Sequence, residues 1–317
     1  MIAAALADGV RAGERRAVAK AITLVESRRP DDELETERLL AELAPSTGRA
    51  RRLGVSGPPG AGKSTLIDAL GSALVARGQR VGVLAIDPSS LKGGGSLLGD
   101  RTRMTRLGVE PRAFVRPSPS SGAAGGLGRR TREALIVLEA AGYDFLIVET
   151  VGVGQGELGV TEVADALLVL LMAGAGDDVQ GMKRGILEHA DVIAFTKADG
   201  ANQTLAEAAA SELASLLHAL RGSELPVLTT SASEGRGIDA LVGAVEQRFR
   251  ALEASGELAT RRGARRRAWF QAALLERVAE RLALSPELVA RRATLEAAVE
   301  RGELLPPAAA RQLLSLL

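Results

Sequence analysis

The first 49 residues are predicted to be helical, because their apolar side chains recur at the three- and four-residue spacing of a buried helix face. Asp8 fits the N-cap of a first helix, and Pro30 fits the start of a second. Pro45 is expected to end the second helix, since proline cannot continue one. We therefore expect an N-terminal helical extension over residues 1–49.

From Arg51 the pattern changes to short apolar runs that alternate with longer amphipathic segments. The apolar runs are residues 53–56, 81–86, 144–150, 166–172, 191–196 and 225–230. The amphipathic segments are residues 63–77, 129–141, 178–189, 202–220 and 237–251. Strands that are apolar on both faces are typical of a parallel sheet covered by helices on each side. The alternation predicts an α/β fold over residues 50–252, with a doubly wound, mostly parallel sheet.

Residues 253–317 contain no strand pattern and are predicted to form a helical arm, with helix starts at Ser285-Pro286 and Pro306. Its first helix carries a basic cluster, which consists of Arg261, Arg262, Arg265, Arg266 and Arg267. Such a cluster either contacts nucleic acid or is a solvated face paired with nearby glutamates. We favour the solvated face, because the charge of the whole chain is balanced.

The composition excludes several kinds of partner and of chemistry. The chain has 40 basic and 39 acidic residues, a net charge of +1, so we expect neither nucleic acid nor a membrane as partner. No cysteine is present, which excludes disulfides, thiolate metal sites and a cysteine nucleophile. No run of about 18 uncharged apolar residues occurs, and no secretory signal begins the chain. We expect a cytoplasmic protein.

Residues Gly57–Ser64 read GPPGAGKS, a complete phosphate-binding loop of the form G-x-x-x-x-G-K-S. The loop follows an apolar strand and opens a helix, which is the context that this motif requires. Its glycines allow backbone N–H groups to point at phosphate oxygens. Lys63 would add a charge at the terminal phosphates, and the Ser64 hydroxyl would bind Mg²⁺.

Two further segments indicate that the base is guanine. Thr196-Lys197-Ala198-Asp199 follows an apolar strand and matches the guanine-reading motif of GTPases, although Thr196 stands where asparagine is usual. In that motif the aspartate accepts from two guanine N–H groups and the lysine stem covers the base. Thr230-Ser231-Ala232 follows the last strand and matches the loop whose backbone amide meets the guanine oxygen.

Three carboxylates follow strands or glycine-rich loops at the expected carboxyl edge of the sheet: Asp87, Asp100 and Glu149. Mg²⁺ prefers oxygen ligands and retains several waters, so one or two of these carboxylates suffice. Glu149 opens a segment rich in glycine that includes Gln155 and could rearrange when a phosphate leaves.

Four longer segments are more specific than these motifs: residues 86–104, 116–126, 149–157 and 173–191. Together they resemble the MeaB/ArgK family of P-loop GTPases, which accompany adenosylcobalamin-dependent methylmalonyl-CoA mutase and related acyl-CoA mutases. The resemblance implies a GTP-hydrolysing chaperone that gates the loading, protection and release of adenosylcobalamin on such a mutase. It also implies that residues 253–317 form a dimerisation arm and that the protein is a homodimer.

The resemblance assigns roles residue by residue. Catalysis would involve Lys63, Asp87, Glu149 and Gln155, and Mg²⁺ would be bound by Ser64, Asp87, Asp100 and Glu149. Nucleotide contacts would come from Gly57, Pro58, Gly60, Ala61, Gly62, Lys63, Ser64, Thr65, Lys197, Asp199, Ser231 and Ala232. Residues 173–184 would form an additional switch that signals to the mutase. Gly93, Ser121, Gly156 and Ala173 depart from the family pattern, which leaves the fine geometry of the switch loops open.

Three other interpretations remain. A nickel-insertion GTPase shares this architecture, but it needs clustered His or Cys, and the two histidines, His189 and His218, are isolated. An ATP-using kinase of an amino-acid transport binding protein would differ in its base preference. A binding module with a vestigial GTPase would hydrolyse GTP slowly with every partner.

Overall fold

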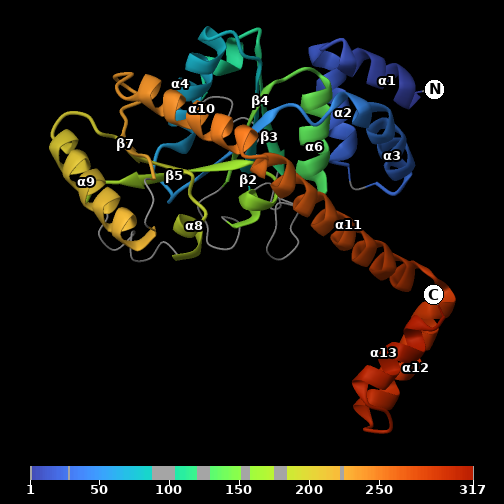
Figure 1. Cartoon of the computed structure of the whole chain (residues 1–317). Helices are drawn as coiled ribbons and strands as arrows, with labels where there is room; N and C mark the ends of the chain where they lie inside the picture. The colour runs from blue at the N-terminus through green and yellow to red at the C-terminus, as the bar shows by residue number, and fades with distance from the viewer. Residues whose placement is uncertain are drawn as a thin grey trace. The chain divides into compact units, whose positions relative to one another are not determined.

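The computed structural model describes residues 2–27, 29–87, 104–119, 129–150, 158–174, 184–221 and 225–316 (Figure 1). Within it the chain divides into two compact units, Met1–Arg262 and Gly263–Leu317. None of the helices in the described part of the chain combines the length and apolar character that a membrane crossing requires.

The first unit is built on a seven-stranded sheet in the order β3-β2-β4-β1-β5-β6-β7, with every neighbouring pair parallel. The strands are β1 (Arg51–Ser56), β2 (Val81–Asp87), β3 (Ala113–Pro119), β4 (Phe145–Glu149), β5 (Ala166–Met172), β6 (Val192–Thr196) and β7 (Val227–Thr229). The prediction of a doubly wound parallel sheet is confirmed. Because all strands run the same way, their carboxyl ends share one edge of the sheet, where ligands bind in this architecture.

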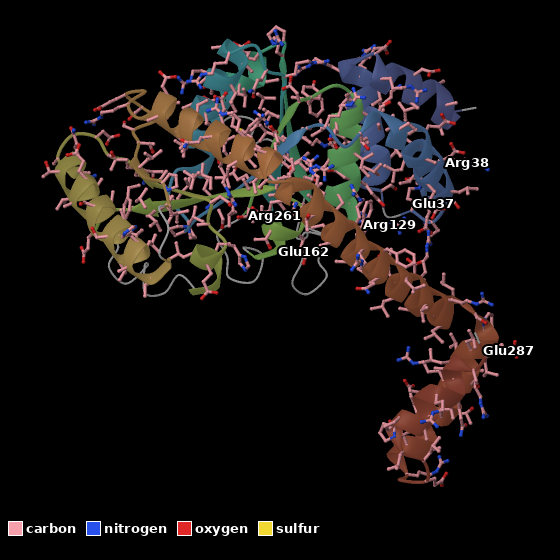
Figure 2. All side chains as sticks on the ribbon, in the orientation of Figure 1. Glu37, Arg38, Arg129, Glu162, Arg261 and Glu287 are labelled. Atoms are coloured by element: carbon pink, nitrogen blue, oxygen red, sulfur yellow. The ribbon has the colours of Figure 1, made fainter. Side chains whose placement is uncertain are left out.

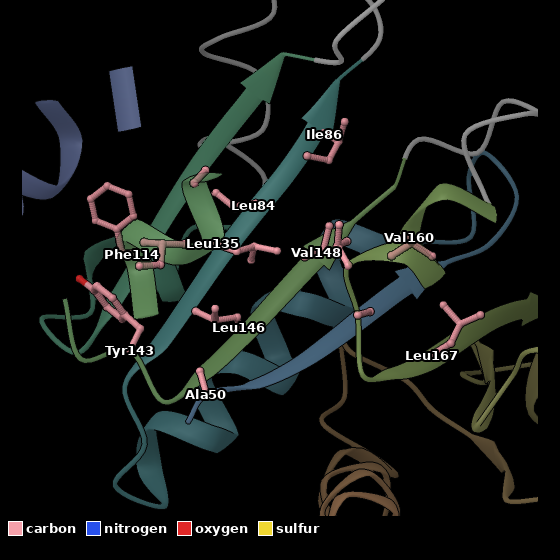
Figure 3. Close-up of a cluster of buried hydrophobic side chains, with 14 of the residues drawn as sticks. Ala50, Leu84, Ile86, Phe114, Leu135, Tyr143, Leu146, Val148, Val160 and Leu167 are labelled. Carbon is pink, nitrogen blue, oxygen red and sulfur yellow. The ribbon is translucent and has the colours of Figure 1, made fainter. Parts of the chain in front are cut away.

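Helices cover both faces of the sheet over two hydrophobic clusters. On one face, α4 (Lys63–Ala76) and α10 (Ile238–Ala254) bury Leu66, Leu70 and Phe249. The other face is covered by α6 (Arg129–Ala140), α8 (Arg184–Glu188) and α9 (Asn202–Arg221). Figure 3 shows the cluster beneath α6, where Leu135 lies with Leu84 and Leu146 of the sheet.

The N-terminal extension forms three helices, α1 (Ile2–Arg11), α2 (Arg15–Val25) and α3 (Asp31–Leu43), followed by the 3₁₀ turn η1 (Ala44–Ser46). They pack beside α6 and belong to the first unit. The prediction that Asp8 caps the first helix is wrong, because α1 begins at Ile2 and Asp8 lies inside it, paired with Arg11 at 2.6 Å. The helix predicted to start at Pro30 is confirmed as α3.

Strand β3 was not predicted. Arg116, Pro117 and Pro119 interrupt its apolar pattern, and proline cannot donate a ladder hydrogen bond. An edge strand tolerates these residues, and within the described part of the chain β3 pairs with β2 alone. The 3₁₀ turn η3 (Leu107–Val109) precedes β3 along the chain, and another 3₁₀ turn, η5 (Leu158–Glu162), follows β4.

The C-terminal segment consists of α11 (Glu257–Leu284), α12 (Pro286–Glu300) and α13 (Pro306–Leu314), which confirms the predicted helix starts. Ser285 caps α12 by accepting from the N–H of Leu288. Arg261, labelled in Figure 2, pairs with Glu257 at 2.6 Å, as expected for a solvated face, but it also donates to the carbonyl oxygen of Asp165 at 3.2 Å.

Arg262, by contrast, contradicts the expectation of a solvated basic face. Its guanidinium donates to both oxygens of Asp165, at 3.1 and 2.5 Å, and to the carbonyl of Gly48 at 2.7 Å. Burial alone would lower the pKa of Arg262, but the hydrogen bond and negative charge of Asp165 outweigh it and raise that pKa. The first residues of α11 are therefore anchored at the amino end of the sheet, beside the starts of β1 and β5.

Candidate nucleotide site

The phosphate-binding loop lies between Ser56, the last residue of β1, and Lys63, the first of α4. Gly57 has a φ of 154°, and a Cβ atom there would stand 2.7 Å from the carbonyl oxygen of Leu170. Only glycine fits this close approach to β5. The N-cap of α4 is Gly62, also in a left-handed conformation, so the N-terminus of α4 faces the loop.

Lys63 makes hydrogen bonds to the loop, and Ser64 makes one to the end of β4. The Lys63 ammonium donates to the carbonyls of Gly57 (2.8 Å) and Pro58 (3.0 Å). The Ser64 hydroxyl donates to Oε1 of Glu149 at 2.9 Å. Glu149 at the end of β4 is thus brought to Ser64 at the start of α4, although the two residues lie far apart in the sequence.

Glu149 ends β4 between two strands. It lies in register with Val55 of β1 on one side and Ala85 of β2 on the other. Asp87 follows two residues after Ala85, so its backbone lies at the same carboxyl edge. The Ser64 hydroxyl and the Glu149 carboxylate are hard oxygen donors, 8% exposed as residues, which fits Mg²⁺. Among the described residues, no group of three or more acidic or His side chains could hold a metal ion. Mg²⁺ does not require such a group, because it retains several water ligands.

Thr196 joins the base-reading motif to the phosphate loop. Its hydroxyl lies 2.7 Å from the carbonyl oxygen of Ala61 in the loop and 3.1 Å from that of Leu171 in β5. Thr196 is 5% exposed and Ala61 is fully buried, so water cannot replace these contacts. The departure from asparagine therefore leaves a working side-chain donor at this position.

Asp199 is held by two serine hydroxyls. Its Oδ2 accepts from Ser231 at 2.8 Å and from Ser233 at 2.9 Å. These hydrogen bonds, that from Ser231 first, hold the pKa of Asp199 below the ordinary aspartate value. An ionised carboxylate that accepts is what recognition of two guanine N–H groups requires.

A tight turn supports the two serines. Ser231 donates its N–H to the carbonyl of Arg236 at 2.9 Å, and its hydroxyl accepts from the N–H of Glu234 at 3.2 Å. Gly237 follows with a φ of 75°, where a Cβ atom would stand 2.2 Å from the Thr229 carbonyl oxygen. Sequence reasoning missed Ser233 and Arg236, because the guanine-loop match stops at Ala232.

Lys197 lies between the two halves of the site. It adopts a left-handed backbone conformation with a φ of 55°, which is uncommon for a residue with a side chain. A Cβ atom placed at Gly62 would stand 4.0 Å from Cε of Lys197. The stem of Lys197 thus lies near the phosphate loop, and its place over the base stays a prediction.

Several predicted residues lie outside the described part of the chain: Asp100, Gln155, the side chain of Asp87, and residues 175–183 of the additional switch. Their roles stay predictions. At one edge of the sheet, the described residues bring together a phosphate-binding loop, the hydrogen-bonded oxygens of Ser64 and Glu149, and a carboxylate held by two serine hydroxyls.

Comparison with known proteins agrees with this arrangement. The family model described as "Methylmalonyl Co-A mutase-associated GTPase MeaB" matches residues 18–287. GTPase ArgK of Escherichia coli is 48% identical over 262 residues, which are 80% of this chain and 79% of that protein. The mitochondrial methylmalonic aciduria type A homolog of Mus musculus is 41% identical over 98% of this chain and 78% of its own.

A solved structure extends the likeness to three dimensions. The crystal structure of a LAO/AO transport system kinase has a TM-score of 0.74 and 37% sequence identity, covering 99% of this chain and 97% of its own.

Proposed function

The chain belongs to the MeaB family of methylmalonyl-CoA mutase-associated GTPases and hydrolyses GTP, and we propose that it couples this reaction to adenosylcobalamin handling by an acyl-CoA mutase. The coupling would gate loading, protection and release of the cofactor. The relative from Mus musculus, which is named for methylmalonic aciduria, supports the choice of partner.

The observation that carries the proposal is the connection between base reading and phosphate binding. Thr196 joins β6 to the phosphate loop through Ala61, and the next turn presents Asp199. A guanine base on Asp199 and its phosphates at Lys63 would therefore be held by two segments that the Thr196 hydrogen bond joins. A conformational switch needs such a connection, because it must sense the whole nucleotide.

We assign the reaction to the residues at the carboxyl edge of the sheet. Backbone N–H groups of the loop and the ammonium of Lys63 would bind the phosphates and stabilise the charge that develops on the transferred group. Ser64, Glu149, Asp87 and Asp100 would hold Mg²⁺, which supplies positive charge next to the β- and γ-phosphates when bound. Gln155 and Asp87 would orient the attacking water.

Assembly is also part of the proposal. The C-terminal arm exposes large apolar side chains of α11: Phe270 is 68% exposed, Leu275 is 70% exposed and Leu284 is 79% exposed. Large apolar side chains gathered on one helix usually contact a partner. We propose that they pack against a second copy of this chain, giving a homodimer, and that residues 173–184 contact the mutase.

The test is the rate of GTP hydrolysis with and without an adenosylcobalamin-dependent mutase, measured beside the rate with ATP. We expect stimulation by the mutase and little use of ATP. A kinase function, such as the name of the LAO/AO transport system kinase implies for that protein, would instead favour ATP. A rate that stays slow and unchanged with each acyl-CoA mutase would favour a binding module with a vestigial GTPase.

A further inference from the structure

A buried polar cluster joins the N-terminal extension to the catalytic edge of the sheet. Glu26, the C-cap of α2, accepts from Nη2 of Arg116 at 2.6 Å and from Oγ of Ser118 at 2.5 Å. Arg116 also donates to Oγ1 of Thr23 at 3.3 Å. The Glu26 side chain is 7% exposed, and Ser118 is 2% exposed.

A second ion pair with the N-terminal extension, less buried than the first, lies at the start of α6. Arg129, labelled in Figure 2, pairs with Glu33 of α3 at 3.2 Å and with Glu133 of its own helix at 2.7 Å. The two contacts hold the last residues of β3 and the first residue of α6. We call this set of five residues the brace: Glu26, Glu33, Arg116, Ser118 and Arg129.

The position of Arg116 and Ser118, the two residues of the brace that lie on β3, suggests a function beyond packing. Phe114, Arg116 and Ser118 are alternate residues of β3 and therefore share one face. Phe114 packs against Tyr143, with ring centroids 6.0 Å apart, as expected of a hydrophobic interface. Burying a charged pair generally stabilises a fold no more than apolar packing does. Of the side chains that β3 itself presents on this face, the charged and hydroxyl ones stand at its carboxyl end. At the other end Arg15 of α2 lies over the ring of Phe114, 5.7 Å from its centroid, without a carboxylate partner from β3.

At that end, β3 lies directly beside the proposed site. Ser118 is in register with Ile86, and Pro119 is in register with Asp87. Among the described strands, β3 is at the edge and pairs only with β2, so its other supports are the helices packed on its faces. The hydrogen bonds of Glu26 fix the last residues of β3 against α2.

We propose that Glu26 is a positioning residue for GTP hydrolysis, which acts by holding the end of β3 in place beside Asp87. The proposal rests on the role proposed for Asp87 at the phosphates. It assigns the N-terminal extension a part in the chemical step, in addition to its role in covering the sheet. The step itself requires accurate placement, since a displacement of about 1 Å can cost roughly 100-fold in rate.

The test compares Glu26→Ala and Ser118→Ala with a matched control in the full-length chain, without any mutase. Glu139 is the control, because it is also a buried glutamate, accepting from the Ala50 N–H at 2.6 Å and from Arg52 at 2.7 Å. It lies at the amino end of the sheet, away from the proposed site. We expect Glu26→Ala to lower kcat about 10-fold or more and Ser118→Ala to lower it several-fold, with the Kd for GDP unchanged. Glu139→Ala should lower the unfolding midpoint and leave kcat unchanged.

Ser118→Ala removes one hydroxyl and leaves no buried charge, so it keeps the test valid if Glu26→Ala folds poorly. Unchanged kcat in Ser118→Ala, or an equal fall in kcat in Glu139→Ala, would overturn the proposal. A wild-type rate that does not respond to a mutase would contradict the proposed coupling but not this inference, because the test measures basal hydrolysis alone.

Discussion

At the scale of single residues, the hydroxyl of Thr196 is the clearest link between the two halves of the nucleotide site. Thr196→Val keeps the shape of the side chain but removes the donor to Ala61 and Leu171. Leaving buried carbonyls without that donor should lower the free energy of unfolding by about 1–3 kcal/mol. We also expect weaker GDP binding, measured by calorimetry.

Thr36→Val is the matched control for this prediction. Thr36 of α3 is also buried, and its hydroxyl donates to the carbonyl of Leu24 at 3.3 Å, within the N-terminal extension and outside the proposed site. This control variant should lower the free energy of unfolding while leaving the GDP affinity near that of the wild type. An equal loss of affinity in both variants would mean that Thr196 acts only through general stability.

The lowered pKa of Asp199 leads to a prediction about pH. Because this pKa lies below the ordinary value, Asp199 stays ionised at mildly acidic pH, and its contribution to guanine binding is lost only as the pH falls through the lowered pKa. Replacing Ser231 and Ser233 with alanine should raise the pKa, so that binding begins to weaken at a higher pH. NMR titration of the carboxylates measures the change directly.

Glu303 is an internal reference for that titration. Its pKa is also held below the ordinary value, by the hydrogen bond from Arg301 in the C-terminal segment. It should titrate identically in wild type and double variant. If Asp199 titrates at the same pH in both proteins, the two serines do not determine its ionisation.

The sequence predicted Asp199 and Ser231 because both lie within short motifs whose chemistry requires them. It did not predict Ser233, because a serine two residues past a motif has no distinguishing pattern. Only the turn formed by the Ser231–Arg236 bridge brings the Ser233 hydroxyl to the carboxylate.

At the scale of elements, the root of α11 depends on the buried pair between Arg262 and Asp165. The Arg262 side chain is 13% exposed and that of Asp165 is 1% exposed. Removing one partner of a buried pair leaves the other charge uncompensated, so Arg262→Ala should lower the free energy of unfolding by about 3–5 kcal/mol. Chemical denaturation measures this loss.

The control for this prediction is Arg301→Ala. Arg301 pairs with Glu303 at 2.6 Å, but both side chains are more than half exposed. Exposed pairs contribute about 0–1 kcal/mol, so little change is expected. Equal losses in the two variants would show that burial does not set the strength of the Arg262 pair.

Element prediction succeeded where periodicity was strong and failed where a neighbour determines the structure. Most of the six predicted strands are apolar on both faces, and each of the six is present in the sheet. Strand β3 has prolines and an arginine, and it is extended because β2 offers a partner and α2 supplies Glu26. Likewise, Arg262 belongs to a basic run in the sequence, and only the fold brings Asp165 to it.

At the scale of the whole molecule, the proposed homodimer depends on the apolar side chains of α11. Phe270→Glu, combined with Leu274→Glu, places charges at positions that are 68% and 52% exposed in the single chain. We expect light scattering to give a dimer for wild type and a monomer for this double variant. The reason is that a charge buried at an interface without a partner is costly.

Leu205→Glu is the control for the assembly prediction. Leu205 on α9 is 60% exposed and is not part of the C-terminal arm. This variant should remain dimeric. A dimeric Phe270→Glu/Leu274→Glu protein would place the interface elsewhere.

The most direct test of the central claim is the affinity of the full-length protein for an adenosylcobalamin-loaded methylmalonyl-CoA mutase, compared between a GTP analogue and GDP. The same titration is repeated for Asp199→Asn with xanthosine nucleotides, since asparagine cannot accept from both guanine N–H groups but suits xanthine. We predict that the affinity of the wild type depends on the guanine nucleotide and that the affinity of Asp199→Asn depends on the xanthosine nucleotide. Binding that is absent, or equal in all nucleotide states for both proteins, would contradict the account.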